Sequence, residues 1–151
     1  MSERHVALLV EDDPEMAAEI GDLLRSFGHD YLHAETLEDA RSLLETGGFC
    51  YALLDLEIKA ERRSIKPRVE SGMSVLRELR QRFPQRCSSD MHVLPVLVIS
   101  GHGREPRTII GAFQDGIDDF ILKPLSAGGQ DRGGSVCRYS VSAPMSGCPA
   151  G

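Results

Sequence analysis

The fold of this chain is decided near its start by the sequence VALLVEDDP, residues 6–14. Five apolar residues in a row are typical of a strand that is buried on both faces of a sheet. Asp13 and Pro14 then supply an N-cap and the first residue of a helix. Apolar residues at helical spacing continue to Phe27, and Gly28 is a stop signal. The stretch therefore predicts a strand that leads directly into a helix.

Strand and helix patterns alternate through the rest of the chain. Further strands are predicted at residues 31–34, 50–54, 93–99 and 119–122. Helices are predicted from Thr36 to Gly47, after Gly72, and around residues 109–113. This alternation implies an α/β domain with a mostly parallel sheet and helices on both faces. Ligands bind such sheets at the carboxyl ends of the strands, so the residues that end the strands are the candidates for function.

Size and composition exclude several other classes of protein. With 151 residues, 41% hydrophobic and 26% charged, the chain has the composition of one globular domain. No apolar run is long enough to cross a membrane and no export signal is present, so we expect a cytoplasmic protein. The four cysteines are widely spaced, which is typical of reduced thiols. A net charge of -6 disfavours binding to nucleic acid.

The polar residues that end the predicted strands form the candidate site. They are Glu11, Asp12, Asp55, Ser100 and Lys123. Carboxylates at one edge of a sheet repel one another unless a cation neutralises them, and Mg²⁺ accepts one or two carboxylates, a carbonyl and waters. A lysine and a serine can hold a phosphoryl group while a carboxylate attacks its phosphorus. The pattern predicts a magnesium-dependent phosphoryl site with Asp55 as the nucleophile.

Five segments carry a resemblance to a known family. They are VEDDP (10–14), LLDL (53–56), SGM (71–73), PVLVISG (95–101) and GIDDFILKP (116–124). In this order they resemble the receiver domain of two-component response regulators, a CheY-like family. The resemblance implies a flavodoxin-like, doubly wound sheet of five parallel strands in the order 2-1-3-4-5, with strands numbered along the chain.

The resemblance implies a role for each acidic residue. Asp55 would be the phosphoacceptor, taking its phosphoryl group from a phosphohistidine on a sensor histidine kinase or a phosphotransfer protein. Asp12 would bind Mg²⁺ directly and Glu11 through a water molecule. The backbone carbonyl of Glu57 would complete the protein's share of the ligands, whereas Asp13 is expected to cap a helix.

The resemblance also implies a switch. Ser100 would donate a hydrogen bond to the phosphoryl oxygen and draw its loop inward, and Phe120 would follow as the aromatic switch. Lys123 would pair with the phosphate, oriented by a cis bond to Pro124. Ser100 could instead be an ordinary loop hydroxyl, and Phe120, which alternates with Ile121 in a strand, could be a plain core residue. A Phe lacks a hydroxyl, so any switch at this position would act by packing alone.

The segment from about residue 57 to residue 71 is longer than is usual in the family. It contains the basic residues Lys59, Arg62, Arg63, Lys66 and Arg68. One hypothesis is a mobile, solvated loop, because long insertions cost little free energy. The other is a surface that docks an acidic partner or helps to hold the phosphorylated state.

The end of the chain departs from the family as well. We expect the receiver domain to span residues 1–125, and residues 126–151 to form a tail rich in Gly, Ser and Pro where the family has a fifth helix. The expected explanation is a truncated or frame-shifted terminus, and the alternative is a tail that packs in another way. An uncovered sheet face would favour aggregation or a homodimer.

The function predicted from the sequence is that of a single-domain response regulator in a phosphorelay. It would not be an enzyme beyond its own phosphorylation and dephosphorylation. Output would pass to an unidentified protein without direct nucleic-acid binding, because the tail holds only two basic residues, Arg132 and Arg138. The alternatives are a non-phosphorylated scaffold, a remnant of a larger regulator, and a phosphatase with an aspartyl nucleophile.

Overall fold

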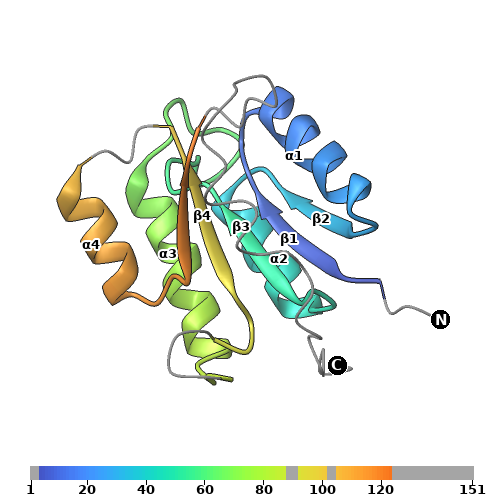
Figure 1. Cartoon of the computed structure of the whole chain (residues 1–151). Helices are drawn as coiled ribbons and strands as arrows, with labels where there is room; N and C mark the ends of the chain where they lie inside the picture. The colour runs from blue at the N-terminus through green and yellow to red at the C-terminus, as the bar shows by residue number, and fades with distance from the viewer. Residues whose placement is uncertain (1–3, 88–91, 102–104, 124–151) are drawn as a thin grey trace, which may run out of the picture.

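A computed structural model describes residues 4–87, 92–101 and 105–123 of the chain (Figure 1). Its strands are β1 (Val6–Val10), β2 (Asp30–Ala34), β3 (Tyr51–Leu54), β4 (Val96–Ser100) and β5 (Asp119–Leu122). Its helices are α1 (Pro14–Ser26), α2 (Leu37–Thr46), α3 (Val69–Arg82) and α4 (Pro106–Gln114). Strands and helices therefore alternate in the described part of the chain as predicted.

The five strands form one parallel sheet in the order β2-β1-β3-β4-β5. This confirms the predicted doubly wound, flavodoxin-like architecture. The register sets Val10 opposite both Ala34 on β2 and Leu54 on β3. Because β1 and β3 end side by side, the residues that follow them emerge at the same edge of the sheet (Figure 1).

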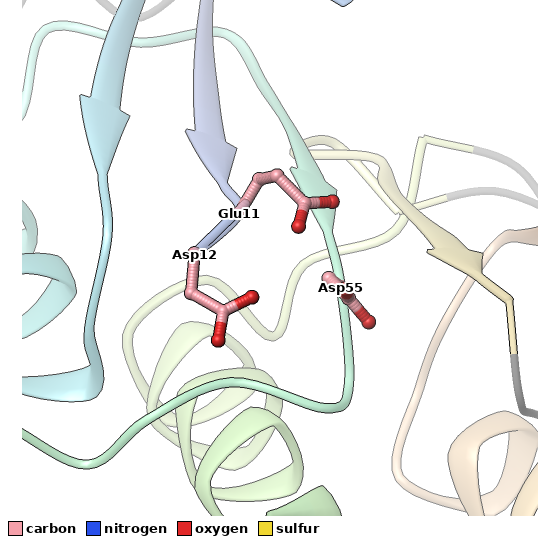
Figure 2. Close-up of side chains that lie close together, drawn as sticks. All are labelled: Glu11, Asp12 and Asp55. Carbon is pink, nitrogen blue, oxygen red and sulfur yellow. The ribbon is translucent and has the colours of Figure 1, made fainter. Parts of the chain in front are cut away.

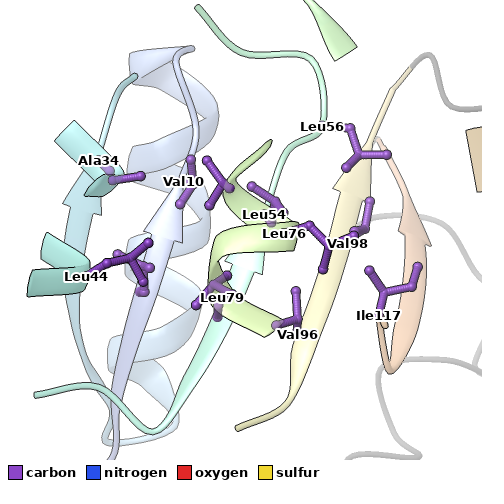
Figure 3. Packing of buried hydrophobic residues seen from close by; sticks show 14 of the residues in the cluster. Val10, Ala34, Leu44, Leu54, Leu56, Leu76, Leu79, Val96, Val98 and Ile117 are labelled. Atoms are coloured by element: carbon purple, nitrogen blue, oxygen red, sulfur yellow. The ribbon is translucent and has the colours of Figure 1, made fainter. Parts of the chain in front are cut away.

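Helices cover the two faces of the sheet unequally. The larger core cluster lies on the face covered by α2, α3 and α4, and Figure 3 shows Leu44, Leu76 and Leu79 of these helices packed over Val10 and Leu54. The smaller cluster lies under α1, where Ala17, Ile20 and Leu24 belong to one cluster with residues on the other sides of β1, β3 and β4. Alternate residues of β1 enter the two clusters, which explains why this strand is apolar along its whole length.

Two of the predicted helix caps are present. The Asp13 side chain accepts hydrogen bonds from the backbone N–H groups of Glu15 and Met16, with Pro14 at the first turn of α1. The Thr36 hydroxyl accepts a hydrogen bond from the Asp39 N–H at the start of α2. These side chains satisfy backbone donors that have no partner within the helix.

The prediction that α3 begins after Gly72 is wrong. The helix begins at Val69, so Gly72 lies within it and the connection from β3 occupies residues 55–68. Gly72 has another reason to be glycine, because a Cβ at this position would collide with the backbone of Leu56. The close approach lets the Gly72 N–H donate to the Leu56 carbonyl at 3.1 Å.

A buried ionic network fixes the amino-terminal ends of β4 and β5. The Asp118 carboxylate accepts hydrogen bonds from the Arg80 guanidinium at 2.8 Å and from the His92 backbone N–H at 2.8 Å. It also accepts one from the Val96 N–H at 2.9 Å. Since α3, β4 and β5 are all joined through Asp118, the network sets where β5 runs, and β5 carries Lys123 to the other edge of the sheet.

Several predictions fall outside the described residues or need correction. The tail at residues 126–151, with the homodimer inferred from it, and the peptide bond to Pro124 lie outside the described residues. Cys50 takes part in a disulfide, so the expectation of reduced thiols is wrong for this residue, whereas Cys87 is an exposed thiol outside any disulfide. None of the helices in the described residues combines the length and the hydrophobicity of a transmembrane span.

The substitution Gly72→Ala tests the contact between α3 and the segment after β3. We expect it to lower the free energy of unfolding by about 1–3 kcal/mol, because the added methyl group meets backbone that cannot rotate away. Gly111→Ala in α4 is the matched control, since a Cβ there has nothing within 4 Å. Urea denaturation should show the control to be neutral or slightly stabilised, by up to ~1 kcal/mol; equal stability of the two variants would contradict this packing.

Candidate functional site

Three carboxylates converge at the carboxyl edge of the sheet. Glu11 and Asp12 follow β1, and Asp55 follows β3 directly. Each offers a carboxylate oxygen within 4.8 Å of the others (Figure 2). Glu11 and Asp55 are buried, with only 1% of Glu11 exposed, and Asp12 is half-buried. Adjacent parallel strands thus bring together residues that are more than forty positions apart in the sequence.

Backbone hydrogen bonds hold two of these carboxylates in place. The Asp13 N–H donates to Glu11 Oε1 at 3.1 Å, and the Glu57 N–H donates to Asp55 Oδ1 at 3.0 Å. In both cases the donor lies two residues further along the chain, so the turn after the strand positions the side chain. The other oxygens of Glu11 and Asp55 are directed to one common partner.

Lys123 is that common partner. Its Nζ donates to Glu11 Oε2 at 2.6 Å and to Asp55 Oδ2 at 3.0 Å. Lys123 directly follows β5, and its backbone N–H donates to the Ser100 carbonyl at 3.1 Å. The ammonium therefore reaches the carboxylates across the end of β4, which lies between β3 and β5.

The electrostatics of the cluster are those of crowded, buried charges. Burial, together with the negative charge of Asp55, raises the pKa of Glu11 to about 7 even though Lys123 opposes the shift. Burial and Asp55 also raise the pKa of Asp12 above its ordinary value, and Lys59 and Lys123 act against this. Burial alone would lower the pKa of Lys123, but its hydrogen bonds to Glu11 and Asp55 outweigh burial and raise it.

The donor set fits a hard divalent cation. Three carboxylates face one ammonium, so one lysine does not neutralise the cluster, and burial together with the negative charge of Asp55 keeps the pKa values of Glu11 and Asp12 raised. Oxygen ligands of this kind suit Mg²⁺, which keeps several waters and binds through a few carboxylates. Within the described residues this is the only group of three or more acidic, His or Cys side chains with such spacing.

The other predicted site residues lie close by or support the edge. Ser100 is buried at the end of β4, in register with Leu122 and bonded through its carbonyl to Lys123. Phe120 lies opposite Val98 in register and packs, partly buried, against the larger core cluster. The Glu57 N–H binds Asp55. The signalling roles of Ser100 and Phe120 and the metal-binding role of the Glu57 carbonyl stay predictions.

Two contributions to the site were not predicted. His33 on β2 contacts the Glu11 carbonyl through Nε2 at 2.8 Å, which fixes the backbone at the end of β1. Lys59 acts on the pKa of Asp12 from the segment after β3. The alternating pattern of β2 shows neither its register nor its neighbour, so the sequence held no signal for His33. The effect of Lys59 could have been expected, because Lys59 follows Asp55 closely in the sequence.

Fold and site together define a CheY-like α/β domain with an acidic cluster at the carboxyl edge of its sheet. Residues 7–129 match the family model of the response regulator receiver domain. The chain therefore belongs to the response regulator receiver family, as its resemblance implied.

Curated relatives agree with this membership. The response regulator protein FleR of Pseudomonas aeruginosa is 28% identical over 120 residues, which are 80% of this chain and 22% of FleR. The transcriptional regulatory protein CpxR of Klebsiella pneumoniae is 29% identical over 119 residues, 79% of this chain and 43% of CpxR. The chain thus spans less than half the length of these relatives.

Solved structures give the same fold. The receiver domain of NtrX from Brucella abortus is 26% identical with a TM-score of 0.63, and the match covers 80% of this chain and 87% of that domain. A CheY-like receiver domain protein from Methanospirillum hungatei has a TM-score of 0.66 at 18% identity, covering 82% of this chain and 85% of that one. The second similarity concerns the fold alone.

The raised pKa of Glu11 makes stability depend on pH. The folded state holds this proton more tightly than a free glutamate, whose pKa is 4.5, so the stability it contributes is lost as pH rises towards 7. In metal-free buffer, Glu11→Gln should therefore gain roughly 1–3 kcal/mol over the wild type between pH 5 and pH 8. Urea denaturation at several pH values measures this difference.

The control for this measurement is Glu19→Gln, which changes an exposed glutamate on α1. Its stability should run parallel to that of the wild type across the same pH range. A difference between Glu11→Gln and the wild type that stays constant from pH 5 to pH 8 would contradict the raised pKa of Glu11.

Proposed function

We propose that this receiver domain accepts a phosphoryl group on Asp55 in a magnesium-dependent reaction and thereby changes its binding to a partner protein. The donor would be a phosphohistidine on a sensor histidine kinase or a phosphotransfer protein. One observation carries the proposal: Lys123 bonds both Glu11 and Asp55, so an acceptor carboxylate, a metal-binding carboxylate and a phosphate-binding ammonium share one edge. Membership in the receiver family supports it.

Asp55 is the nucleophile in this proposal. A carboxylate oxygen of Asp55 attacks phosphorus, an O–P bond forms as the P–N bond to the donor imidazole breaks, and the electron pair stays on the imidazole nitrogen. The Glu57 N–H and the Lys123 ammonium hold the two Asp55 oxygens and fix the direction of the carboxylate before transfer.

The remaining acidic residues serve the metal. Glu11, Asp12 and Asp55, with the backbone carbonyl of Glu57, would hold Mg²⁺, and the bound ion would offset the charge on the phosphoryl oxygens. Their crowding supports this role, because a divalent cation would offset both the burial of these carboxylates and the repulsion from Asp55, which together raise the pKa of Glu11 and Asp12.

Lys123 and Ser100 would respond to the new phosphoryl group. Lys123 exchanges a carboxylate partner for a phosphoryl oxygen, and the Ser100 hydroxyl donates to another, so that the end of β4 moves towards Asp55. Phe120 lies one strand further out, partly buried against the core, and would repack as β4 shifts. The result is a shift in population between two conformations that differ in partner affinity.

The domain would act as a signalling element that catalyses only its own phosphorylation and dephosphorylation. Its surroundings would be the cytoplasm, where kinases and phosphotransfer proteins donate from histidine. The output partner would be a protein that distinguishes the two conformations. Because the chain spans less than half of FleR and CpxR, the activities of those whole proteins are not carried over.

Phosphorylation with a small donor tests the proposal. Incubation with acetyl phosphate and Mg²⁺ should add the mass of one phosphoryl group to the wild type, measured on the intact protein. Asp55→Asn should gain nothing, and chelation of Mg²⁺ with EDTA should prevent the gain in the wild type. Asp22→Asn, which changes an exposed aspartate on α1, is the matched control and should be modified like the wild type.

The other outcomes identify the alternatives. A wild type that stays unmodified would favour the scaffold or the remnant. Continuous hydrolysis of unrelated phosphoesters would favour the phosphatase. Modification of Asp55→Asn to the same extent as the wild type would show that another residue is the acceptor.

A further inference from the structure

The connection between β3 and α3 is a concentrated basic surface on an acidic protein. Five of the chain's 17 Lys and Arg residues lie within residues 59–68, whereas the whole chain has a net charge of -6. We call residues 58–68 the basic loop. Glu61 is its one acidic residue. Lys59 acts on the Asp12 carboxylate, and the other cations of the loop are not part of the phosphoryl site described above.

Both ends of the basic loop are fixed. Ile58 is fully buried, and its carbonyl accepts a hydrogen bond from the Arg68 N–H at 2.8 Å, which closes the loop. The Lys59 carbonyl accepts one from the Leu37 N–H at 3.0 Å, where α2 begins. The loop is therefore closed on itself and bonded to α2, and this argues against the hypothesis of a wholly mobile insertion.

The tip of the loop surrounds a cationic hollow. A cavity of about 550 Å³ is lined by Arg63, Lys66 and Arg68 together with small polar and apolar residues, and by no carboxylate. These three cations make no ion pair with any acidic residue in the described residues, whereas Arg62 lies 3.9 Å from Asp39. Ile65, which also lines the hollow, is 91% exposed.

The basic loop is next to the phosphoacceptor. It starts three residues after Asp55, and Lys59 lies close enough to Asp12 to act on its carboxylate. A protein seated on the hollow would thus lie beside the carboxyl edge of the sheet, where any phosphoryl donor has to come.

We propose that the basic loop is the docking surface for an acidic patch on the protein that delivers the phosphoryl group to Asp55. Carboxylates of that protein would face Arg63, Lys66 and Arg68, and an apolar side chain would cover Ile65. An apolar contact ringed by charges is the composition of a protein–protein interface. A nucleic acid or an anionic membrane is disfavoured because the rest of the chain is acidic and would repel an extended polyanion. This inference rests on the proposed function.

The test compares protein donors with a small donor. Histidine kinase cores and phosphotransfer domains of the source organism, each phosphorylated, are mixed one by one with the full chain, and the fastest donor becomes the probe. The variant carries Arg63→Gln, Lys66→Gln and Arg68→Gln. We expect transfer from the probe to slow about tenfold or more at low salt, and the difference to shrink as salt rises. Phosphorylation by acetyl phosphate should be unchanged.

A matched control separates docking from net charge. Arg41→Gln, Arg77→Gln and Arg107→Gln remove the same charge from exposed positions on α2, α3 and α4. This control should accept phosphoryl groups from the probe within about twofold of the wild-type rate. A further variant, Ile65→Ser, should slow transfer from the probe at every salt concentration, because its contact is apolar.

The results distinguish docking of the phosphoryl donor from other roles of the basic loop. Equal transfer rates for the loop variant and the control, or no transfer to the wild type from any protein donor, would overturn the docking role. Loss of binding to duplex DNA or to anionic vesicles in the loop variant alone would assign the loop to those ligands and overturn it as well. Failure of acetyl phosphate to modify the wild type would contradict the proposed function instead.

Discussion

The repulsion among Glu11, Asp12 and Asp55 is the constraint on which the site depends. Like charges in a buried setting destabilise the folded protein unless a cation compensates them. Lys123 supplies one positive charge and bonds two of the three carboxylates. The cluster is thus incompletely neutralised, and this excess of negative charge suits the proposed binding of a divalent cation.

The rest of the fold holds this unfavourable arrangement in place. Adjacent parallel strands bring Glu11 and Asp55 to one edge, and backbone N–H groups two residues further on fix both side chains. At the opposite edge, the buried network around Asp118 joins α3 to the start of β5. Since β5 carries Lys123, the position of the ammonium depends on a network at the other end of the strand.

The sequence predicted which residues meet at the sheet edge better than it predicted the element boundaries. Each candidate at a strand end was found because carboxyl ends of parallel strands meet at one edge, which holds whatever the exact boundaries. The start of α3 was predicted too late because Gly72 was interpreted as a helix boundary. A glycine is needed at this position because the helix packs closely on the backbone of Leu56. The predicted start of β4 at residue 93 is too early, since the strand begins at Val96. The Val93 N–H donates to the Gln85 carbonyl and not to a neighbouring strand.

Contacts that depend on register could not be predicted. His33 reaches the Glu11 carbonyl only because β2 pairs with β1 in a particular alignment, and Asp118 meets Arg80 only after α3 has packed on the sheet. No local pattern encodes either contact. The sequence shows the basic loop as a cluster of Lys and Arg residues, but its hydrogen bonds to α2 form only in the folded chain.

Asp55 is the one of three neighbouring carboxylates that we propose as the phosphoacceptor. Reductive trapping with borohydride converts an acyl phosphate into an alcohol, and tandem mass spectrometry of the trapped peptides then locates the modified residue. After treatment with acetyl phosphate and Mg²⁺, the alcohol should be found at Asp55 and at neither Glu11 nor Asp12. Trapping at Glu11 or Asp12, or at no carboxylate of a protein that has gained phosphoryl mass, would show that Asp55 is not the phosphoacceptor.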